Sequence, residues 1–568
     1  MKRSGIAARL ARASAMGLWL ASASTLALAA PHRKSDPHEA RIRQLEQEMQ
    51  QLADDNRKLH AQDEQLTARA EQLETEVAAL KQSEASQTQV IQTQGQTLQA
   101  QAQSIKTVEA NAPAAPSVVT NMLNGRPFFT SADGRFTFTA HTVMQLDTAA
   151  YFQAAPGPIA EDLRRSGPAL GASAANVDLT HARDLKAGTD FRRARLGLDG
   201  TVFGDWDWRL LFDFAGTGVE NTGQLYETWV QYSGFKPLRL RVGAFPPSIG
   251  MEDQASTNGM PFMERSVVED LSRGFAAGDT RLAAQAYGWG DHWLLSAAIT
   301  GRTIGVINTG TAAAVPQTFG DQLGFVGRGA ITPFHGDDWL VQFGAHGSLA
   351  RPGDNAGPGA NGSTPITGRV VSFSNTQQVR VDGTKLLNTG NIDASQAHTV
   401  GGEFAAQKKN FLAQAEYESF GVDRTDIVSS PEFHGFYAEG LWTITGEPRV
   451  YNKQTAAFDA PIPTHPFDWN AGTWGAWELG VRYSDMDLNY HAGLAGAAPP
   501  PDGIRGGEEQ NVSVDLNWYP NPVVKFMFDY EHVRVSRLSP NAVVYQTPVG
   551  AEIGQTYDAV AVRSQFSF

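Results

Sequence analysis

The chain has 568 residues, and 46 Lys and Arg stand against 60 Asp and Glu, so its formal net charge is -14 at pH 7. This acidic balance argues against general nucleic-acid binding, although it is compatible with a local basic channel inside an acidic shell. Because the chain contains no cysteine, disulfide bonds, thiolate metal sites and cysteine nucleophiles are excluded.

Residues 1–30 predict a cleaved secretory signal peptide. Basic residues between Lys2 and Arg12 precede an apolar run, and small residues follow that run at Ala29 and Ala30. No later stretch contains eighteen consecutive apolar residues, which excludes a helical membrane protein. A closed β-barrel is then the one structure that could still cross a bilayer.

Residues 38–99 predict an α-helical coiled coil on the periplasmic side of the membrane. Leucine recurs every seven residues, at positions 45, 52, 59, 66, 73 and 80. Ile42, Met49, Ala70 and Val77 lie three residues before a leucine, and Asn56 and Asp63 interrupt this second seam. An isolated helix is the alternative, but it would expose all six leucines to water.

Residues 100–125 lose the heptad pattern and predict a linker. Residues 126–568 then predict a transmembrane β-barrel, because stretches of about ten residues alternate apolar and polar side chains between short turns and long loops. Sixteen strands are expected, near residues 136, 190, 206, 223, 238, 280, 292, 323, 338, 397, 410, 433, 473, 509, 523 and 557.

The even strand count places both barrel ends on the periplasmic side, where the coiled coil is expected. The long loops lie on the other side, at about 154–188, 246–279, 303–322, 351–396, 490–507 and 538–555. One segment fits poorly, because residues 446–470 are far too long for an ordinary periplasmic turn.

Alternation also assigns the two faces of the wall. Leu196, Leu198 and Val202 should face lipid, so arginines at alternate positions should face the lumen. The resulting pore-lining candidates are Arg193, Arg195, Arg239, Arg241, Arg482 and Arg563. A ladder of guanidinium groups would concentrate anions. The alternative is that inward arginines merely neutralise acidic loops.

Aromatic residues cluster near the predicted turns, where a girdle at the membrane interface would lie. Its expected members are Trp206, Trp208, Trp229, Tyr232, Trp289, Trp293, Trp339, Trp518 and Tyr519.

The loop from Phe245 to Thr280 is unusually long and is expected to fold into the barrel and narrow it. Its acids outnumber its bases, which weakens a simple anion-filter hypothesis. The constriction candidates are Glu252, Asp253, Glu264, Arg265 and Arg273.

The final strand, Thr556–Phe568, alternates Val560, Val562 and Phe566 with polar residues and ends on an aromatic side chain. This pattern is typical of a barrel strand in an outer membrane. No motif of a metalloprotease, a nucleotide-binding loop, a serine hydrolase or an EF-hand is present, so we expect neither an enzyme, a cofactor nor a metal site.

Several blocks resemble the porin O and P family, the phosphate- and polyphosphate-selective outer-membrane porins. They follow the family order from residue 125 to residue 568 and include DFRRARLGLDGTVFGDWDWRLLFDFA (190–215), LRLRVGAFPPSIGMED (238–253), FMERSVVED (262–270) and GTWGAWELGVRYSDMDL (472–488).

The resemblance implies a sixteen-stranded barrel, a homotrimer, an arginine ladder and a third loop that together pass small anions. It places Arg192 in the ladder beside Arg193, whereas alternation favours Arg193 and Arg195; a bulge would reconcile the two. One departure is clear. Phosphate-specific members are expected to present lysines at the constriction, yet residues 246–281 contain none.

The sequence therefore predicts an all-β outer-membrane porin of a Gram-negative bacterium, surrounded by lipid, that passes small hydrophilic solutes. Anions such as phosphate or polyphosphate are the expected solutes. The alternative is a general, weakly selective porin whose coiled coil serves as an oligomerisation module or tethers the barrel to the cell wall.

Overall fold

The computed structural model describes residues 41, 69, 75, 77–78, 81–82, 87–104, 118–123, 126–153, 185–215, 223–277, 280–303, 323–352, 369–425, 429–540 and 549–568. The predicted signal peptide and most of the predicted coiled coil lie outside these residues. The chain divides into two compact units, Met1–Ala114 and Ala115–Phe568, and each is described by itself.

The first unit contains an α-helix over residues 87–104. All of its described side chains are exposed, and Ile91 and Leu98, seven residues apart, are 67% and 65% exposed. No helix within the described ranges is long and apolar enough to cross a bilayer.

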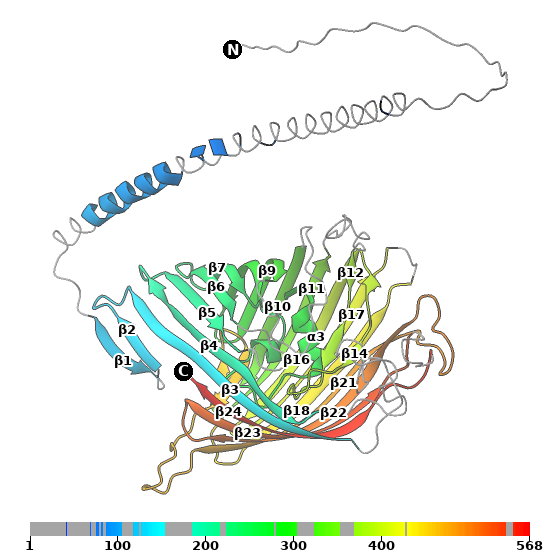
Figure 1. Cartoon of the computed structure of the whole chain (residues 1–568). Helices are drawn as coiled ribbons and strands as arrows, with labels where there is room; N and C mark the ends of the chain where they lie inside the picture. The colour runs from blue at the N-terminus through cyan, green and yellow to red at the C-terminus, as the bar shows by residue number, and fades with distance from the viewer. Residues whose placement is uncertain are drawn as a thin grey trace, which may run out of the picture. The chain divides into compact units, whose positions relative to one another are not determined.

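In the second unit, sixteen of the described strands form one closed antiparallel barrel (Figure 1). Each strand pairs with the next one along the wall, and the last, β24, pairs with the first, β3. The strands are β3 (Thr137–Gln153), β4 (Gly188–Val202), β5 (Trp206–Asp213), β6 (Gln224–Tyr232), β7 (Leu238–Phe245), β8 (Arg281–Trp289), β9 (Trp293–Thr303), β10 (Leu323–His335), β11 (Trp339–Arg351), β16 (Gln396–Lys408), β17 (Phe411–Asp423), β18 (Glu432–Thr443), β21 (Ala476–Tyr490), β22 (Ile504–Tyr519), β23 (Val524–Ser536) and β24 (Thr556–Ser567).

The predicted barrel is confirmed, and its strands begin within a few residues of the predicted positions, because period-2 alternation separates a lipid face from a lumen face. On β24, Val560, Val562 and Phe566 are 45%, 41% and 36% exposed on the outside, and Ala561, Arg563 and Gln565 are buried. Phe568 exchanges two backbone hydrogen bonds with Thr142 of β3, at 2.9 and 3.1 Å, which extend the seam that closes the barrel.

A short hairpin, β1 (Val119–Leu123) and β2 (Arg126–Thr130), precedes the barrel and pairs with the first residues of β3. Residues 100–104 continue the preceding helix. The range predicted as a linker, 100–125, therefore contains secondary structure at both ends.

Three connections carry secondary structure of their own. The loop between β7 and β8 contains α2 (Met251–Gln254), α3 (Val267–Ser272) and the π-helical turn η3 (Arg273–Ala277). The loop between β11 and β16 contains β12 (Val370–Val371), β13 (Ser374–Thr376), β14 (Lys385–Asn388) and β15 (Ile392–Asp393). The segment that fitted the predicted topology poorly forms a hairpin, β19 (Arg449–Asn452) and β20 (Ala457–Pro461).

The loop between β7 and β8 lies inside the barrel, as predicted, and α3 contacts β13, β17, β18 and β21 (Figure 1). Val267, Val268 and Leu271 of α3 are fully buried and pack in one apolar cluster with Phe373 and Leu387 of the loop between β11 and β16. Burial of these side chains holds the loop in the lumen, because each buried side chain of this size contributes roughly 1.5–3 kcal/mol.

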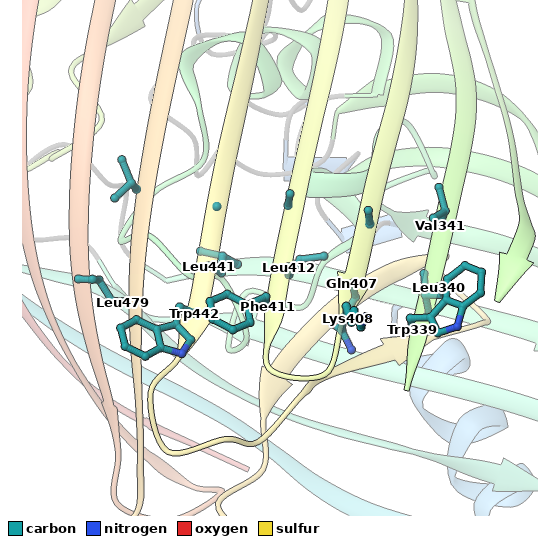
Figure 2. Close-up of a pocket in the computed structure, with 14 residues that line it drawn as sticks. Trp339, Leu340, Val341, Gln407, Lys408, Phe411, Leu412, Leu441, Trp442 and Leu479 are labelled. Carbon is teal, nitrogen blue, oxygen red and sulfur yellow. The ribbon is translucent and has the colours of Figure 1, made fainter. Parts of the chain in front are cut away.

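Aromatic side chains mark the outer wall near the short turns. Figure 2 shows Trp339, Phe411 and Trp442 on β11, β17 and β18, where they are 40%, 54% and 40% exposed. Phe411 and Trp442 stack with their ring centroids 5.8 Å apart. The predicted girdle is therefore present, but three of its expected members belong elsewhere: Trp229, Trp289 and Tyr519 face the lumen.

Candidate functional site in the barrel lumen

The arginines predicted from alternation lie on the lumen side of the wall. Arg193, Arg195, Arg482 and Arg563 are at most 5% exposed, while the neighbouring residues Leu196, Val481 and Val562 face outward. Their charges are therefore inside the barrel, where each must find a partner to offset its lost hydration.

Arg192 also faces inward, because β4 carries a bulge at this point. Gln145 of β3 pairs with Arg193 and the next residue, Leu146, pairs with Phe191, so Arg192 has no residue opposite it. A bulge turns two consecutive side chains to one face. It reconciles the alternation, which assigned Arg193, with the family resemblance, which added Arg192.

Glu264, from the loop between β7 and β8, is the centre of the largest arginine cluster. It accepts hydrogen bonds from Arg192 Nε at 2.7 Å and Nη2 at 2.8 Å, from Arg563 Nη2 at 2.6 Å, and from Arg193 Nη2 at 3.5 Å. Asp147 on β3 also accepts two hydrogen bonds from Arg563, at 2.7 and 2.6 Å. Two carboxylates thus hold three guanidinium groups.

The environment of Glu264 keeps its carboxylate ionised. Burial raises the pKa of this carboxyl, but the charges of Arg192, Arg193 and Arg563 outweigh burial and hold the pKa well below its usual range. The loop therefore carries a permanent negative charge into the arginine cluster.

The other acidic constriction candidates are also paired with arginine. Glu252 accepts from Arg482 Nη1 at 3.0 Å, and Asp253 accepts from Arg273 Nη1 at 2.5 Å. Arg265 instead donates to backbone carbonyls of its own loop, including that of Glu252 at 3.3 Å. These contacts fix the shape of the loop and neutralise its charge at the same time.

Sequence reasoning missed two further buried ion pairs. Arg328 on β10 donates to Glu403 at 2.7 and 2.8 Å, and Arg449 on β19 donates to Glu478 at 2.8 and 2.9 Å. Alternation along β10, applied as it was to β4, would have assigned Arg328 to the lumen. Arg449 has no such signal, since it lies in the connection between β18 and β21.

The hairpin β19–β20 enters the lumen from the side of the short turns. Arg328 donates to the backbone carbonyls of Thr455 and Ala456 at 2.5 and 2.9 Å, and Gln342 on β11 donates to Ala456 at 3.1 Å. Arg449 reaches the carbonyl of Gly259 in the loop between β7 and β8, at 2.9 Å. The hairpin and this loop therefore meet inside the barrel and narrow it together.

One lysine reaches the constriction from the wall rather than from the loop. Lys525 on β23 is 3% exposed, and its Nζ donates to the backbone carbonyl of Met260 at 2.6 Å. Phe526 and Phe528 flank the lumen-facing positions of this strand and face outward, so alternation could have found Lys525. Residues 246–281 contain no lysine, but Lys525 brings one to the constriction from the barrel wall.

Arg239 and Arg241 on β7 differ from the other predicted ladder residues. Both are half-buried and face the lumen, and neither has a carboxylate oxygen within 4.0 Å in the described part of the chain. Arg195, by comparison, donates to Asp213 at 2.8 Å. Acids therefore neutralise five of the predicted ladder residues: Arg192, Arg193, Arg195, Arg482 and Arg563. The ladder hypothesis still applies to the other two, Arg239 and Arg241.

Two neighbouring acids of α3, Glu269 and Asp270, are also buried. Burial raises the pKa of Glu269 well above its usual range, and the carboxylates of Glu418 and Asp253 add to this effect. Burial also raises the pKa of Asp270 to about 6, although the charge of Arg380 lowers it. In the described ranges, no group of three or more His, Asp or Glu is arranged to hold a metal ion.

Replacement of Asp270 by Asn is expected to reduce the pH dependence of stability. Because the pKa in the folded state exceeds its ordinary value of 3.8, the wild-type free energy of unfolding should fall as pH rises from about 4 to about 6. Asn does not titrate, so the free energy of unfolding of the variant should fall less over this pH range, by up to about 2–3 kcal/mol. Urea unfolding in detergent at both pH values measures it; identical slopes for the two proteins would contradict the assignment.

Comparison with known proteins agrees with this architecture. The family model described as "Phosphate-selective porin O and P" matches residues 168–568. Porin O of Pseudomonas aeruginosa is 27% identical over 362 residues, which is 62% of this chain and 78% of that protein.

Two solved structures illustrate the range of similar folds. OmpT of Vibrio cholerae has a TM-score of 0.40 and 10% identity, covering 76% of this chain and 98% of that one. An anion-selective porin from Comamonas acidovorans has a TM-score of 0.38 and 10% identity, covering 76% and 100%. Because the family model matches well over half of the chain, the protein belongs to the phosphate-selective porin O and P family.

Proposed function

We propose that this protein is an outer-membrane porin that passes small hydrophilic solutes by passive diffusion and prefers anions. The observation that carries the proposal is the pair Arg239 and Arg241, whose positive charges face the lumen and have no carboxylate partner among the described residues. Unneutralised charge on a pore wall attracts ions of opposite sign and repels ions of the same sign. Family membership supports the same conclusion.

Replacement of both Arg239 and Arg241 by Ala should lower the chloride-to-potassium permeability ratio towards one. The zero-current potential across a potassium chloride gradient in a planar bilayer measures this ratio. The control replaces both residues by Lys, which keeps the charge and should keep the selectivity. An unchanged potential in the Ala variant would remove the basis of the proposal.

Phosphate and polyphosphate are the solutes that the family name suggests. Lys525 supports this extension, because its ammonium group lies at the constriction and an ammonium group binds phosphate well. Addition of phosphate during the same recordings tests it: a block of chloride current at low phosphate supports a phosphate site. Indifference to phosphate would leave an anion-preferring porin of broader range.

We further propose that residues 38–99 form a coiled coil that joins copies of the chain, with a homotrimer as the expected assembly. Ile91 and Leu98 of the described helix support association, because both are largely exposed. Their distances from Val77 in the sequence are multiples of seven, so they share its heptad position. A tether from the coiled coil to the cell wall is the alternative role.

Deletion of residues 38–110 separates these roles. If the helices join the copies, the truncated protein should run as a monomer in cross-linking and in native electrophoresis while its unit conductance stays the same. If they tether the barrel to the cell wall, the trimer should persist and the envelope should become more sensitive to detergent. Full assembly and an intact envelope after deletion would contradict both roles.

A further inference from the structure

Aromatic rings and guanidinium groups alternate on the lumen face of β5–β8. We call this group the arginine–aromatic band; its members are Arg209, Trp229, Arg239, Arg241, Tyr287 and Trp289. All are half-buried except Tyr287, which is 6% exposed. Elsewhere in the lumen, the arginines named above are nearly fully buried. Porin lumens are polar, so half-buried tryptophans on the inner wall are unusual.

Strand register brings the members of the band together. Arg209 lies opposite Trp229 across β5 and β6, and Arg239 lies opposite Tyr287 across β7 and β8. The guanidinium of Arg241 is 4.3 Å from the centre of the Trp229 ring, and that of Arg239 is 4.9 Å from the centre of Trp289. Each cation thus lies beside an indole ring that is itself open to the lumen.

The two guanidinium groups keep N–H donors that the described residues do not use. Arg241 donates through Nε to Gln231 at 3.0 Å and through Nη2 to the Tyr287 hydroxyl at 2.9 Å, and Nη1 makes no hydrogen bond to the described residues. Within the described ranges, Arg239 donates only through Nη1, to the carbonyl of Leu238 at 3.2 Å. Positively charged N–H groups beside aromatic surface are therefore available to a passing solute.

From this arrangement we infer that the band selects aromatic carboxylates over compact or aliphatic anions. The inference rests on the proposed anion conduction and names the solute class. A carboxylate fits the free edge of a guanidinium, and an aromatic ring attached to it can then stack on Trp229 or Trp289. An inorganic anion gains the charge contact but nothing from the rings, and it loses more hydration in an aromatic environment.

The test uses the full-length protein in planar bilayers with benzoate and cyclohexanecarboxylate as probes. The two anions have the same charge and nearly the same size, but only benzoate has an aromatic ring. The permeability of each relative to chloride comes from reversal potentials. Benzoate should be favoured about threefold or more, the effect of a modest stacking interaction.

Tryptophan variants locate the effect. Trp229→Leu and Trp289→Leu should each reduce the preference for benzoate and leave chloride selectivity unchanged, while Trp229→Phe should retain most of it. Trp206→Leu is the matched control, because Trp206 lies on β5 of the same wall but faces lipid at 45% exposure. Circular dichroism verifies that each variant keeps its β-structure. If a Leu variant does not fold, the benzoate preference of Trp229→Phe still tests the inference.

The outcomes separate the two proposals. A pore that prefers potassium to chloride overturns the anion proposal and this inference with it. A chloride-selective pore that passes both carboxylates equally overturns the inference alone. A loss of chloride selectivity in Trp229→Leu also overturns it, because the rings would then only position the arginines.

Discussion

Shortening of the β19–β20 hairpin is expected to raise single-channel conductance several-fold. The hairpin lies in the lumen. Arg328 and Gln342 on the wall donate hydrogen bonds to its backbone, and its own Arg449 donates to Glu478 on β21. Pore conductance depends on the open cross-section, so removal of a two-stranded segment from the lumen should widen the path for ions. Selectivity should fall at the same time, because ions would pass farther from the charged wall.

The variant replaces residues 449–461 by a short Gly-Ser linker and Glu478 by Gln. The second change is needed because loss of Arg449 would otherwise leave Glu478 buried without its ion-pair partner. The control replaces residues 466–472 of the same connection, which are exposed throughout and should not affect the current. Equal conductance of the shortened and wild-type proteins would show that the hairpin does not limit flow.

Replacement of Glu264 by Gln should have the second large effect, on selectivity and on stability together. Glu264 accepts hydrogen bonds from Arg192, Arg193 and Arg563, so its loss removes one negative charge from beside these three cations. Unmasked positive charge should raise the chloride-to-potassium permeability ratio. Removal of one partner from a buried ion pair should also lower the free energy of unfolding by about 3 kcal/mol or more.

Reversal potentials and urea unfolding in detergent measure the two effects on the same preparation. Glu264→Asp is the control, because it keeps the charge and shortens the side chain by one methylene group. Its selectivity should stay near the wild-type value even if its stability falls. Since the pKa of Glu264 is held well below its usual range, Glu264 should keep its charge as pH falls from 7 to 5. A Gln variant with wild-type selectivity would mean that ions do not approach this cluster.

These two predictions concern a lumen that differs from a simple arginine ladder. Positive charge is abundant on the wall, but acids of the loop between β7 and β8 and of the wall itself neutralise most of it. Arg239 and Arg241 are only two of the lumen arginines, but they should influence a passing ion more than the neutralised ones do. The reason is that charge without a counter-charge determines the field in the pore.

The strands and their faces could be predicted from the sequence, because they depend on local rules. Alternation with period 2 assigned Leu196 and Leu238 to the lipid and Arg193 and Arg241 to the lumen, and the structure confirms these assignments. A bilayer imposes this pattern on every strand, so each strand carries its own signal. The start of β24 and its closing role were predictable for the same reason.

The positions of Arg192, Trp229 and the β19–β20 hairpin were decided by tertiary structure. A bulge adds one residue to β4 and turns Arg192 inward, and strict alternation cannot register such an insertion. Trp229 was predicted for the interfacial girdle because it lies near a turn, yet its strand register turns it towards Arg241. The hairpin lies in the lumen through contacts with β10 and β11, 128 and 114 residues away in the sequence, and with the following barrel strand, β21.

The sequence by itself determined that this protein is a barrel with arginines on its inner wall. Only the tertiary structure decided which of those arginines are neutralised. Glu264 and Arg563 are 299 residues apart, and they meet because apolar packing of α3 seats one loop against the opposite wall. Strand patterns arise from neighbouring residues, whereas ion pairs across a lumen arise from loops whose path is set by packing with the whole barrel.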